Sequence, residues 1–175
     1  MKKFLTILMF CGVVGGYAQN TPPHAASTKT WTFGEQTWSD AIQIPECNKK
    51  SFEESDTEPD CRSYTDAKGN TYYYYNWPYV NTKAARLCPA PWRVPSQADF
   101  YILSHAPTAD MLVSAWGLSG NAYGNTMHNV GSFGIYWSST EISSDYAYAQ
   151  YYISSFGAPP NGTTKQYGLS LRCVR

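Results

Sequence analysis

Hydrophobic and polar residues alternate over several short stretches of this chain, and the pattern predicts strands at both ends. Near the start, aromatic residues lie on both sides of a tight turn at Gly34, which predicts a hairpin over 30–38. The tyrosine run at 72–75 follows a second turn, at 66–70. It favours a strand, because aromatic side chains fit a pleated sheet.

The middle of the chain predicts three short helices. Residues 82–87 are helix formers that end just before a proline. Ser96 and Asp99 form the cap signature of a second helix over 97–104. A third helix is expected over 108–116, closed by the glycine that follows it.

The last third of the chain returns to strand patterns. Residues 117–134 contain five glycines and predict a long irregular loop. Three strands are expected over 136–140, 147–153 and 167–174, with a turn at 157–162. Strands at both ends with helices between them predict a loop-rich α+β domain, in which short helices pack on mainly antiparallel strands.

The first eighteen residues have the features of a cleavable export signal. Lys2 and Lys3 form a basic start, residues 4–14 are almost entirely apolar, and we expect cleavage after Ala18, leaving Gln19 as the new N-terminus. The apolar run is too short to span a bilayer, which takes about 20 residues. No later stretch approaches that length, so we expect no integral membrane segment after signal cleavage.

Lipidation at Cys11 is an alternative, but bulky Phe10 precedes this cysteine and little apolar sequence lies before it. The chain then divides into a signal peptide (1–18), a flexible leader (19–29) and one domain (30–175). Export would place this domain outside the cytoplasm: secreted, on the cell surface or in the periplasm of a Gram-negative bacterium.

The composition limits which partners such a domain can bind. The formal net charge is 0 and becomes −2 once Lys2 and Lys3 are removed. This balance argues against nucleic acid and anionic membranes, because both need a basic patch. Aromatic residues make up 16%, with fifteen tyrosines and six tryptophans, and charged residues only 15%. This composition is typical of rigid extracellular β-rich domains and is compatible with a ligand surface of aromatic rings.

Four cysteines remain after the expected cleavage, and an even count in an exported chain predicts two disulfides. Of the three possible pairings we favour Cys47–Cys61 with Cys88–Cys173. The first encloses an acidic segment without a core of its own, and the second joins the middle of the domain to its last strand. By loop-closure entropy, the first disulfide should stabilise the fold by about 3 kcal/mol and the second by about 4–5 kcal/mol. Zinc is the rival interpretation, but C-x-x-C spacing is absent and histidine is scarce, so we expect no metal.

The sequence contains no recognisable catalytic constellation. Residues 138–140 offer hydroxyls, but a serine nucleophile needs a positioned base. The only histidines are His24, His105 and His128, and their spacing does not suggest a triad. Phosphate-loop, metalloprotease and EF-hand patterns are absent as well. We therefore expect neither catalytic residues nor a cofactor.

Five short motifs occur in this chain in an order that is found in a known family. They are Leu-Cys-Pro-Ala-Pro-Trp-Arg-Val-Pro-Ser (87–96), Tyr-Trp-Ser-Ser-Thr-Glu (136–141) and Leu-Arg-Cys-Val-Arg (171–175), with weaker matches at 34–38 and 75–78. By these motifs the chain resembles the Fibrobacter succinogenes major paralogous domain family over 30–175. It departs from the family at Pro91, where glycine is frequent, and in the inserted loop between Cys47 and Cys61.

The resemblance implies an exported protein of the Bacteroidetes and Fibrobacter lineages. The motifs at 92–95 and 136–140 are also similar to a related domain of bacterial adhesins, which implies a C-type-lectin-like fold. A fold alone does not transfer sugar binding. Calcium-dependent sugar binding in such folds goes with a Glu-Pro-Asn or Gln-Pro-Asp triplet and a Trp-Asn-Asp. Here Glu58-Pro59-Asp60 lies before the expected helices and Trp-Asn-Asp is absent, so we do not expect this activity.

The tryptophans and arginines of the matching motifs are interpreted as structural, because a tryptophan flanked by prolines beside a half-cystine fixes a loop against the core. We expect the two arginines to lie near each other and to pair with Asp99 or Glu141. The structural set is Trp92, Arg93, Pro95, Trp137 and Arg172.

The candidate binding residues are Tyr72, Tyr74 and Trp77. In a strand, Tyr72 to Tyr75 alternate between two faces, so one pair of rings can form a platform for a sugar while the other pair packs in the core. We therefore expect an exported, non-enzymatic surface or secreted domain that binds a glycan or a surface protein. The alternatives are a purely structural module, whose aromatic residues all lie in the core, and a hydrolase without a recognisable site.

Overall fold

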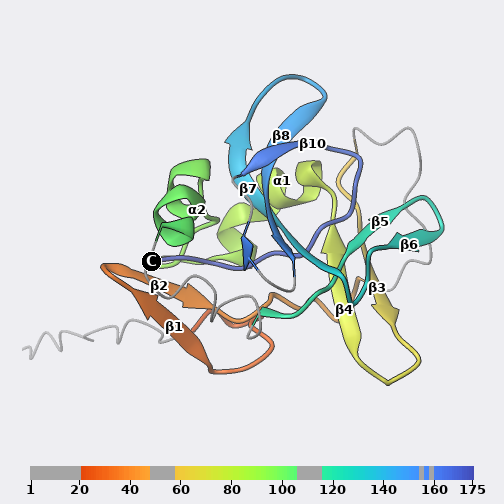
Figure 1. Cartoon of the computed structure of the whole chain (residues 1–175), viewed down its shortest axis with the longest axis horizontal. Coiled ribbons are helices and arrows are strands. Elements are labelled where there is room, and N and C mark those ends of the chain that lie inside the picture. The colour runs from red at the N-terminus through yellow and green to blue at the C-terminus, as the bar shows by residue number, and fades with distance from the viewer. Residues whose placement is uncertain (1–20, 48–57, 106–115, 154–155, 158–159) are drawn as a thin grey trace, which may run out of the picture.

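The computed structural model of the chain describes residues 21–47, 58–105, 116–153, 156–157 and 160–175 (Figure 1). The expected signal peptide, Cys11 and the cleavage position lie outside the described residues, as does the helix expected over 108–116, apart from its last residue. Among the described residues, no helix is long and apolar enough to cross a membrane.

The described part of the fold contains two helices, α1 (Trp77–Leu87) and α2 (Gln97–Ser104). The other elements are short strands. The strands are β1 (Thr30–Phe33), β2 (Gln36–Ser39), β3 (Cys61–Thr65), β4 (Thr71–Tyr75), β5 (Asn121–Tyr123), β6 (Thr126–His128), β7 (Phe133–Glu141), β8 (Tyr146–Ile153), β9 (Phe156–Gly157) and β10 (Asn161–Thr164).

The pairings between these strands are all antiparallel. One sheet has the order β10–β8–β7, with β9 also paired to β8, and three hairpins join β1 to β2, β3 to β4 and β5 to β6. Both helices lie against β7 (Figure 1). The predicted α+β class, with short helices on mainly antiparallel strands, is therefore confirmed.

The C-terminal segment connects several of these elements and ends beside β2 (Figure 1). Leu169 makes a backbone bridge to β4, Ser170 to β7 and Val174 to β2. Because each partner belongs to a different element, the strand predicted over 167–174 is a series of single bridges instead of one regular strand. Residues 168–174 are all buried, since neighbouring elements enclose this segment on both faces.

Two predicted loops contain strands. The irregular loop expected over 117–134 includes the β5–β6 hairpin, and the turn expected over 157–162 ends in the first residues of β10. In the hairpin, Gly124 has a φ of 52°, which glycine adopts without strain. Strands of three or four mostly polar residues show too little alternation for a pattern-based prediction.

The leader expected over 19–29 is part of the folded domain from Pro22 onward. The Ala26 N–H donates to the Ala41 carbonyl oxygen (2.8 Å), and the Gln43 N–H donates to the His24 carbonyl oxygen (2.7 Å). These backbone bonds hold the segment against the chain that follows β2, so its polar composition does not make it a free linker.

Side chains cap the start of both helices. α1 begins at Trp77 and not at the predicted residue 82. The side-chain Oδ1 of Asn76 accepts a hydrogen bond from the Tyr79 N–H (3.0 Å) and caps the helix, and Pro78 fits the first turn. α2 begins as predicted: Ser96 accepts from the Asp99 N–H, and the Asp99 carboxylate accepts from the Ser96 N–H.

The core consists mainly of two clusters of buried side chains. The larger cluster surrounds α1 and includes Trp77, Leu87, Trp92, Trp137 and Leu171. The smaller cluster lies between β2, α2 and β7 and includes Trp38, Phe100, Trp116, Tyr136 and Val174. Each large apolar side chain buried in this way contributes roughly 1.5–3 kcal/mol, so most of the tryptophans stabilise the fold.

Both favoured disulfide pairings are present. Cys47 is joined to Cys61, with their Cα atoms 5.1 Å apart, and Cys88 is joined to Cys173, with Cα atoms 5.6 Å apart. The first disulfide fixes the start of β3, and the second ties the end of α1 to the C-terminal segment.

Candidate functional site

The face of β4 that was expected to carry a sugar platform is covered. Tyr74 is fully buried, and its hydroxyl donates to the Ser119 carbonyl oxygen (2.5 Å). Burial raises the pKa of Tyr74 above its ordinary value. Tyr72 is half-buried and packs in the same cluster, together with Ala122 of β5. The β5–β6 hairpin therefore occupies this face, and Tyr72 and Tyr74 do not form an exposed platform.

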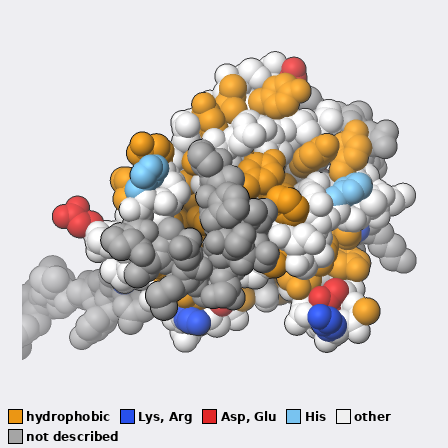
Figure 2. Space-filling model, in the orientation of Figure 1, with side chains coloured by type: hydrophobic (Ala, Val, Ile, Leu, Met, Phe, Trp, Pro, Cys, Tyr) orange, Lys and Arg blue, Asp and Glu red, His pale blue; other side chains and the backbone are white. Residues whose placement is uncertain are grey.

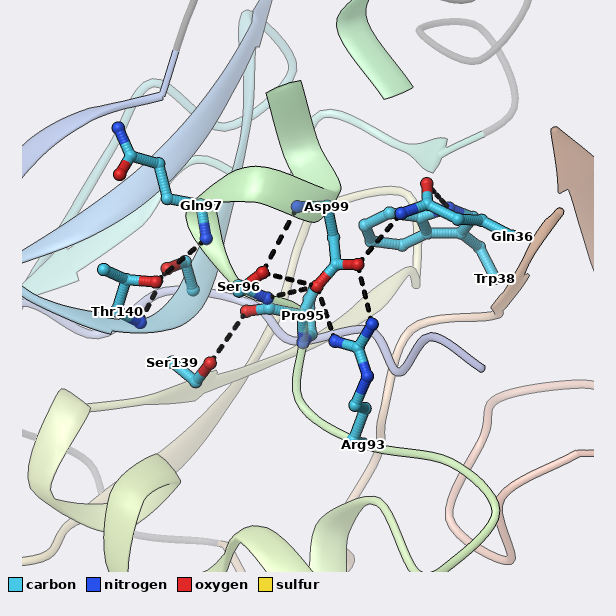
Figure 3. A network of polar contacts seen from close by, with 10 residues as sticks. Gln36, Trp38, Arg93, Pro95, Ser96, Gln97, Asp99, Ser139 and Thr140 are labelled. Carbon is cyan, nitrogen blue, oxygen red and sulfur yellow. Dashed lines mark hydrogen bonds and ion pairs between the residues drawn. The ribbon is translucent and has the colours of Figure 1, made fainter. Parts of the chain in front are cut away.

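A network of polar contacts surrounds Asp99 at the start of α2 (Figure 3). Its carboxylate accepts two hydrogen bonds from Arg93 (2.5 and 2.7 Å), one from Gln36 Nε2 (2.9 Å) and one from the Ser96 N–H (2.7 Å). Burial alone would raise the pKa of this carboxyl, but the hydrogen bonds from Arg93 and Ser96 outweigh it, so the pKa is lowered. Asp99 thus holds α2 to β2 and to the segment before the helix, which is a structural role.

The hydroxyls of 138–140 are also used within the fold. The Ser139 hydroxyl donates to the Pro95 carbonyl oxygen (3.3 Å), and Thr140 Oγ1 accepts from the Gln97 N–H (3.0 Å; Figure 3). Ser138 Oγ accepts from the Thr140 N–H (2.9 Å). The bonds of Ser139 and Thr140 fasten β7 to the start of α2, and the bond of Ser138 lies within β7, so the fold uses all three hydroxyl groups of the motif.

One serine hydroxyl does lie next to a histidine. Ser104 Oγ is 3.1 Å from His105 Nδ1, and that nitrogen is 2.8 Å from the Tyr101 carbonyl oxygen. The contact with the carbonyl requires a proton on Nδ1, so this nitrogen cannot accept the serine proton, and the pair is not an activated nucleophile. Across the described ranges, no group of three or more His, Cys, Asp or Glu side chains could hold a metal ion.

Arg172 is a buried structural residue, only 1% exposed. Its guanidinium lies 4.5 to 5.3 Å from the ring centroids of Trp31, Trp116 and Tyr136. It also donates to the Ser39 and Trp116 carbonyl oxygens, each at 2.8 Å. The planar donor group of arginine suits this combination of stacked rings and backbone acceptors.

The ion pairs of the two motif arginines agree only in part with the expectation. Arg93 pairs with Asp99, as expected. Arg172 pairs with Asp40 (3.3 Å) and not with Asp99 or Glu141. The reason is topological: the C-terminal segment runs beside β2, and Asp40 directly follows that strand.

A hollow of about 550 Å³ lies between α1, the turn that joins β7 to β8, and the end of β10. Its walls come from residues 77–78, 81–82, 144–146 and 164–166. Pockets that bind small ligands have volumes of about 300–1,000 Å³, so the hollow is large enough for one. We refer to it as the α1 pocket.

Two of the residues that line the α1 pocket are mostly buried, and their polar atoms have partners. Lys165 pairs with Glu141, donates to the Ser144 carbonyl oxygen (3.0 Å) and lies 4.5 Å from the Trp77 ring centroid. Trp77 is 6% exposed, and its Nε1–H donates to the Ser138 carbonyl oxygen (3.0 Å). The charge of the ammonium group is thus balanced, and one of its three N–H groups remains for a ligand.

The exposed part of the α1 pocket is aromatic and polar. Tyr146 exposes 50% of its surface. Asn81 and Thr82 of α1 are exposed as well, and Gln166 is half-buried. The carboxylate of Asp145 has no hydrogen bond or ion pair within the part of the chain that the structure describes. Amides, a hydroxyl, a carboxylate and a ring together can donate to, accept from and stack on a ligand rich in hydroxyl groups.

Of the predicted binding residues, Trp77 alone lines the α1 pocket. The predicted set missed Asn81, Asp145, Tyr146 and Lys165, because three segments far apart in the sequence supply them. None of these segments has a motif that signals binding, so only the tertiary structure shows that they lie together.

No known protein family, curated protein or solved structure matches this chain. The α+β class therefore rests on the arrangement of the helices and strands, and the candidate site rests on the geometry of its residues.

Proposed function

We propose that this chain is an exported, non-enzymatic binding domain whose α1 pocket takes a neutral glycan. The observation that carries the proposal is the exposed Tyr146 ring beside uncharged amide and hydroxyl groups, in a pocket whose one lysine is already paired. Sugar hydroxyls both donate and accept hydrogen bonds, and a sugar ring packs on an aromatic face, so this set of groups fits a glycan.

The charge of the pocket favours a neutral ligand over an acidic one. Lys165 is balanced by Glu141, and Asp145 adds a negative charge near the opening. A carboxylate on the ligand would lie near the Asp145 carboxylate, and the pocket has no unpaired cation to balance the two negative charges. Like charges at short range repel each other, so an acidic ligand would bind less well. On the face shown in Figure 2, charged side chains are few, and most of the described surface is hydrophobic or uncharged polar.

Removing the exposed ring tests the proposal. On an array of neutral oligosaccharides, Tyr146→Ala of the mature protein should lose at least about tenfold in affinity. Tyr101→Ala is the matched control, because Tyr101 is also an exposed tyrosine (59%) but lies on α2, outside the α1 pocket. Equal binding by wild type and Tyr146→Ala would exclude the α1 pocket as the glycan site.

A purely structural module is the second candidate, and the buried aromatic residues favour it. Most of the tryptophans are core residues, and Tyr74 and Tyr75 are fully buried. If the wild-type protein binds no oligosaccharide on the array, this candidate replaces the binding domain.

We further propose that the chain belongs with the Fibrobacter succinogenes major paralogous domains and has a C-type-lectin-like fold. The order of the five motifs supports the first part, and the pairing of the N-terminal hairpin with the C-terminal segment supports the second. The signal-like start and two disulfides support an extracytoplasmic location, because disulfides persist in oxidising compartments. Intact-mass measurement of the exported protein tests cleavage after Ala18.

A further inference from the structure

A second hollow, of about 310 Å³, includes Tyr167, the last residue of the turn formed by residues 165–167. It is lined by Asn121 and His128 of the β5–β6 hairpin, by Asn129 just beyond it, and by Tyr151 and Tyr167, with two aliphatic side chains. We refer to it as the hairpin pocket. The α1 pocket described above does not include any of these residues.

The hairpin pocket has the same kind of lining as the α1 pocket, but without formal charges. It contains no Asp, Glu, Lys or Arg. Asn129 Nδ2 donates to Asn121 Oδ1 (3.2 Å), which leaves Asn129 Oδ1 as an acceptor and Asn121 Nδ2 as a donor without partners among the described residues. The Tyr167 ring, which packs at 5.0 Å from the Tyr123 ring, adds an aromatic surface.

The backbone around the hairpin pocket is held in place. A Cβ atom on Gly120 would collide with the His128 carbonyl oxygen, so the chain after β6 lies directly on this glycine. Gly168 and Ala122 exchange two backbone hydrogen bonds (2.8 and 2.9 Å). The positions of both asparagines are therefore set by the fold, and a ligand would meet preformed groups.

The two pockets are neighbours along the chain. Gln166 lines the α1 pocket and Tyr167 lines the hairpin pocket, and consecutive Cα atoms are only about 3.8 Å apart. The turn between the pockets is fixed on both sides: Lys165 is bonded through its backbone to Asp145 (2.9 Å) and to Trp77 (3.0 Å). A single extended ligand could therefore contact both pockets by crossing this turn.

We propose that the α1 pocket and the hairpin pocket are two subsites of one site, which binds a linear neutral oligosaccharide across the 165–167 turn. The inference rests on the proposed function and adds the class of glycan, a chain with at least one sugar unit in each pocket. An extended peptide is the less suitable occupant, because peptides are recognised by backbone pairing at a sheet edge and by apolar side-chain pockets. Both pockets here present side-chain amides and rings instead.

Chain-length dependence tests this inference. Titration calorimetry of the mature protein with neutral oligosaccharides of increasing length, taken from the series that binds on the array, should show affinity rising with length. Tyr167→Ala and His128→Ala should leave the affinity for the shortest binder unchanged. Both variants should lose about tenfold for the longest one, so that the dependence on length disappears.

His128→Ala keeps the test independent of folding, because the His128 side chain is exposed and forms no hydrogen bond within the described residues. Tyr101→Ala is again the control and should behave as wild type at every length. If both hairpin-pocket variants keep the wild-type length dependence while Tyr146→Ala abolishes binding, the two-subsite inference is wrong and the proposed function stands.

Other outcomes go against the proposed function as well. If Tyr146→Ala binds every length as wild type does, the α1 pocket is not a glycan site and both proposals are wrong. The same holds if no oligosaccharide binds. If selected extended peptides protect Tyr167 and Tyr146 from iodination and no oligosaccharide competes with them, the ligand of this site is a peptide and not a glycan.

Discussion

Arg172 lies in the core as a charged side chain, and its surroundings explain why the fold tolerates it. The guanidinium stacks against three aromatic rings and donates to two backbone carbonyl oxygens and to Asp40. A buried charge is costly unless it is paired and hydrogen-bonded, and both terminal nitrogens of Arg172 meet these conditions. The residue therefore joins the C-terminal segment to β2 and to the Trp116 backbone.

The tyrosines of β4 should differ sharply in what they contribute to stability. Tyr74→Phe removes the hydroxyl that donates to the buried Ser119 carbonyl oxygen, which should lower the free energy of unfolding by about 1–2 kcal/mol. Tyr72→Phe is the matched control, since its hydroxyl bonds at 3.3 Å to the exposed carboxylate of Asp66, and it should change stability by less than about 0.5 kcal/mol. Urea denaturation measures both. Equal effects would mean that Tyr74 is not enclosed by the β5–β6 hairpin.

At the scale of elements, α2 depends on a carboxylate whose pKa is lowered in the folded protein. Asp99 holds its proton less tightly when folded than when unfolded, where its pKa is about 3.9. The unfolded chain therefore binds the proton first on acidification. The stabilisation from Asp99 is fully present above about pH 4 and is lost as the pH falls through the lower, folded pKa.

Asp99→Asn should show this dependence directly. At pH 7 the variant loses the charged partner of Arg93, which should cost about 2 kcal/mol of unfolding free energy. The difference from wild type should shrink toward zero as the pH is lowered below the folded pKa of Asp99. Glu35→Gln, at an exposed carboxylate in the β1–β2 turn, is the control. A destabilisation that is the same at every pH would contradict the role of the charge.

Element by element, the sequence predicted those structures whose signals are local. The α2 helix was found because Ser96 and Asp99 cap it, and the first hairpin because Gly34 separates aromatic residues. The start of α1 was missed because the prediction rested on the helix formers of 82–87 and did not include the cap at Asn76 or the proline in the first turn. β5 and β6 were missed because they are short, and their stability comes from packing on Tyr74.

At the scale of the whole molecule, the candidate site could not be predicted from the sequence. The α1 pocket joins the start of α1 to the β7–β8 turn and to the end of β10, and Trp77 was the only predicted member. The tyrosine run looked like a platform because alternation alone does not show what covers each face of a strand. The β5–β6 hairpin covers this face of β4, and it lies far from β4 in the sequence.

The disulfides also act at this scale, and their effects should be unequal. Cys88–Cys173 closes a loop with a sequence separation of 85 and lies in the core, whereas Cys47–Cys61 spans 14. By loop-closure entropy, the two disulfides contribute about 4–5 and about 3 kcal/mol, respectively, to the free energy of unfolding. The double variant Cys88→Ser/Cys173→Ser should therefore be less stable than Cys47→Ser/Cys61→Ser, and its two buried hydroxyls should add to the loss.

Peptide mapping without reduction should first recover the two linked pairs and no free thiol in the mature protein. Urea denaturation of the two double variants then compares their stabilities, and Cys47→Ser/Cys61→Ser should retain oligosaccharide binding because neither cysteine lines the α1 pocket. A peptide linking Cys47 to Cys88 would contradict the fold, since it would require the end of α1 to leave the C-terminal segment. A larger loss of stability in Cys47→Ser/Cys61→Ser would instead mean that the segment after β2 contributes more to the core than the connection between α1 and the C-terminus.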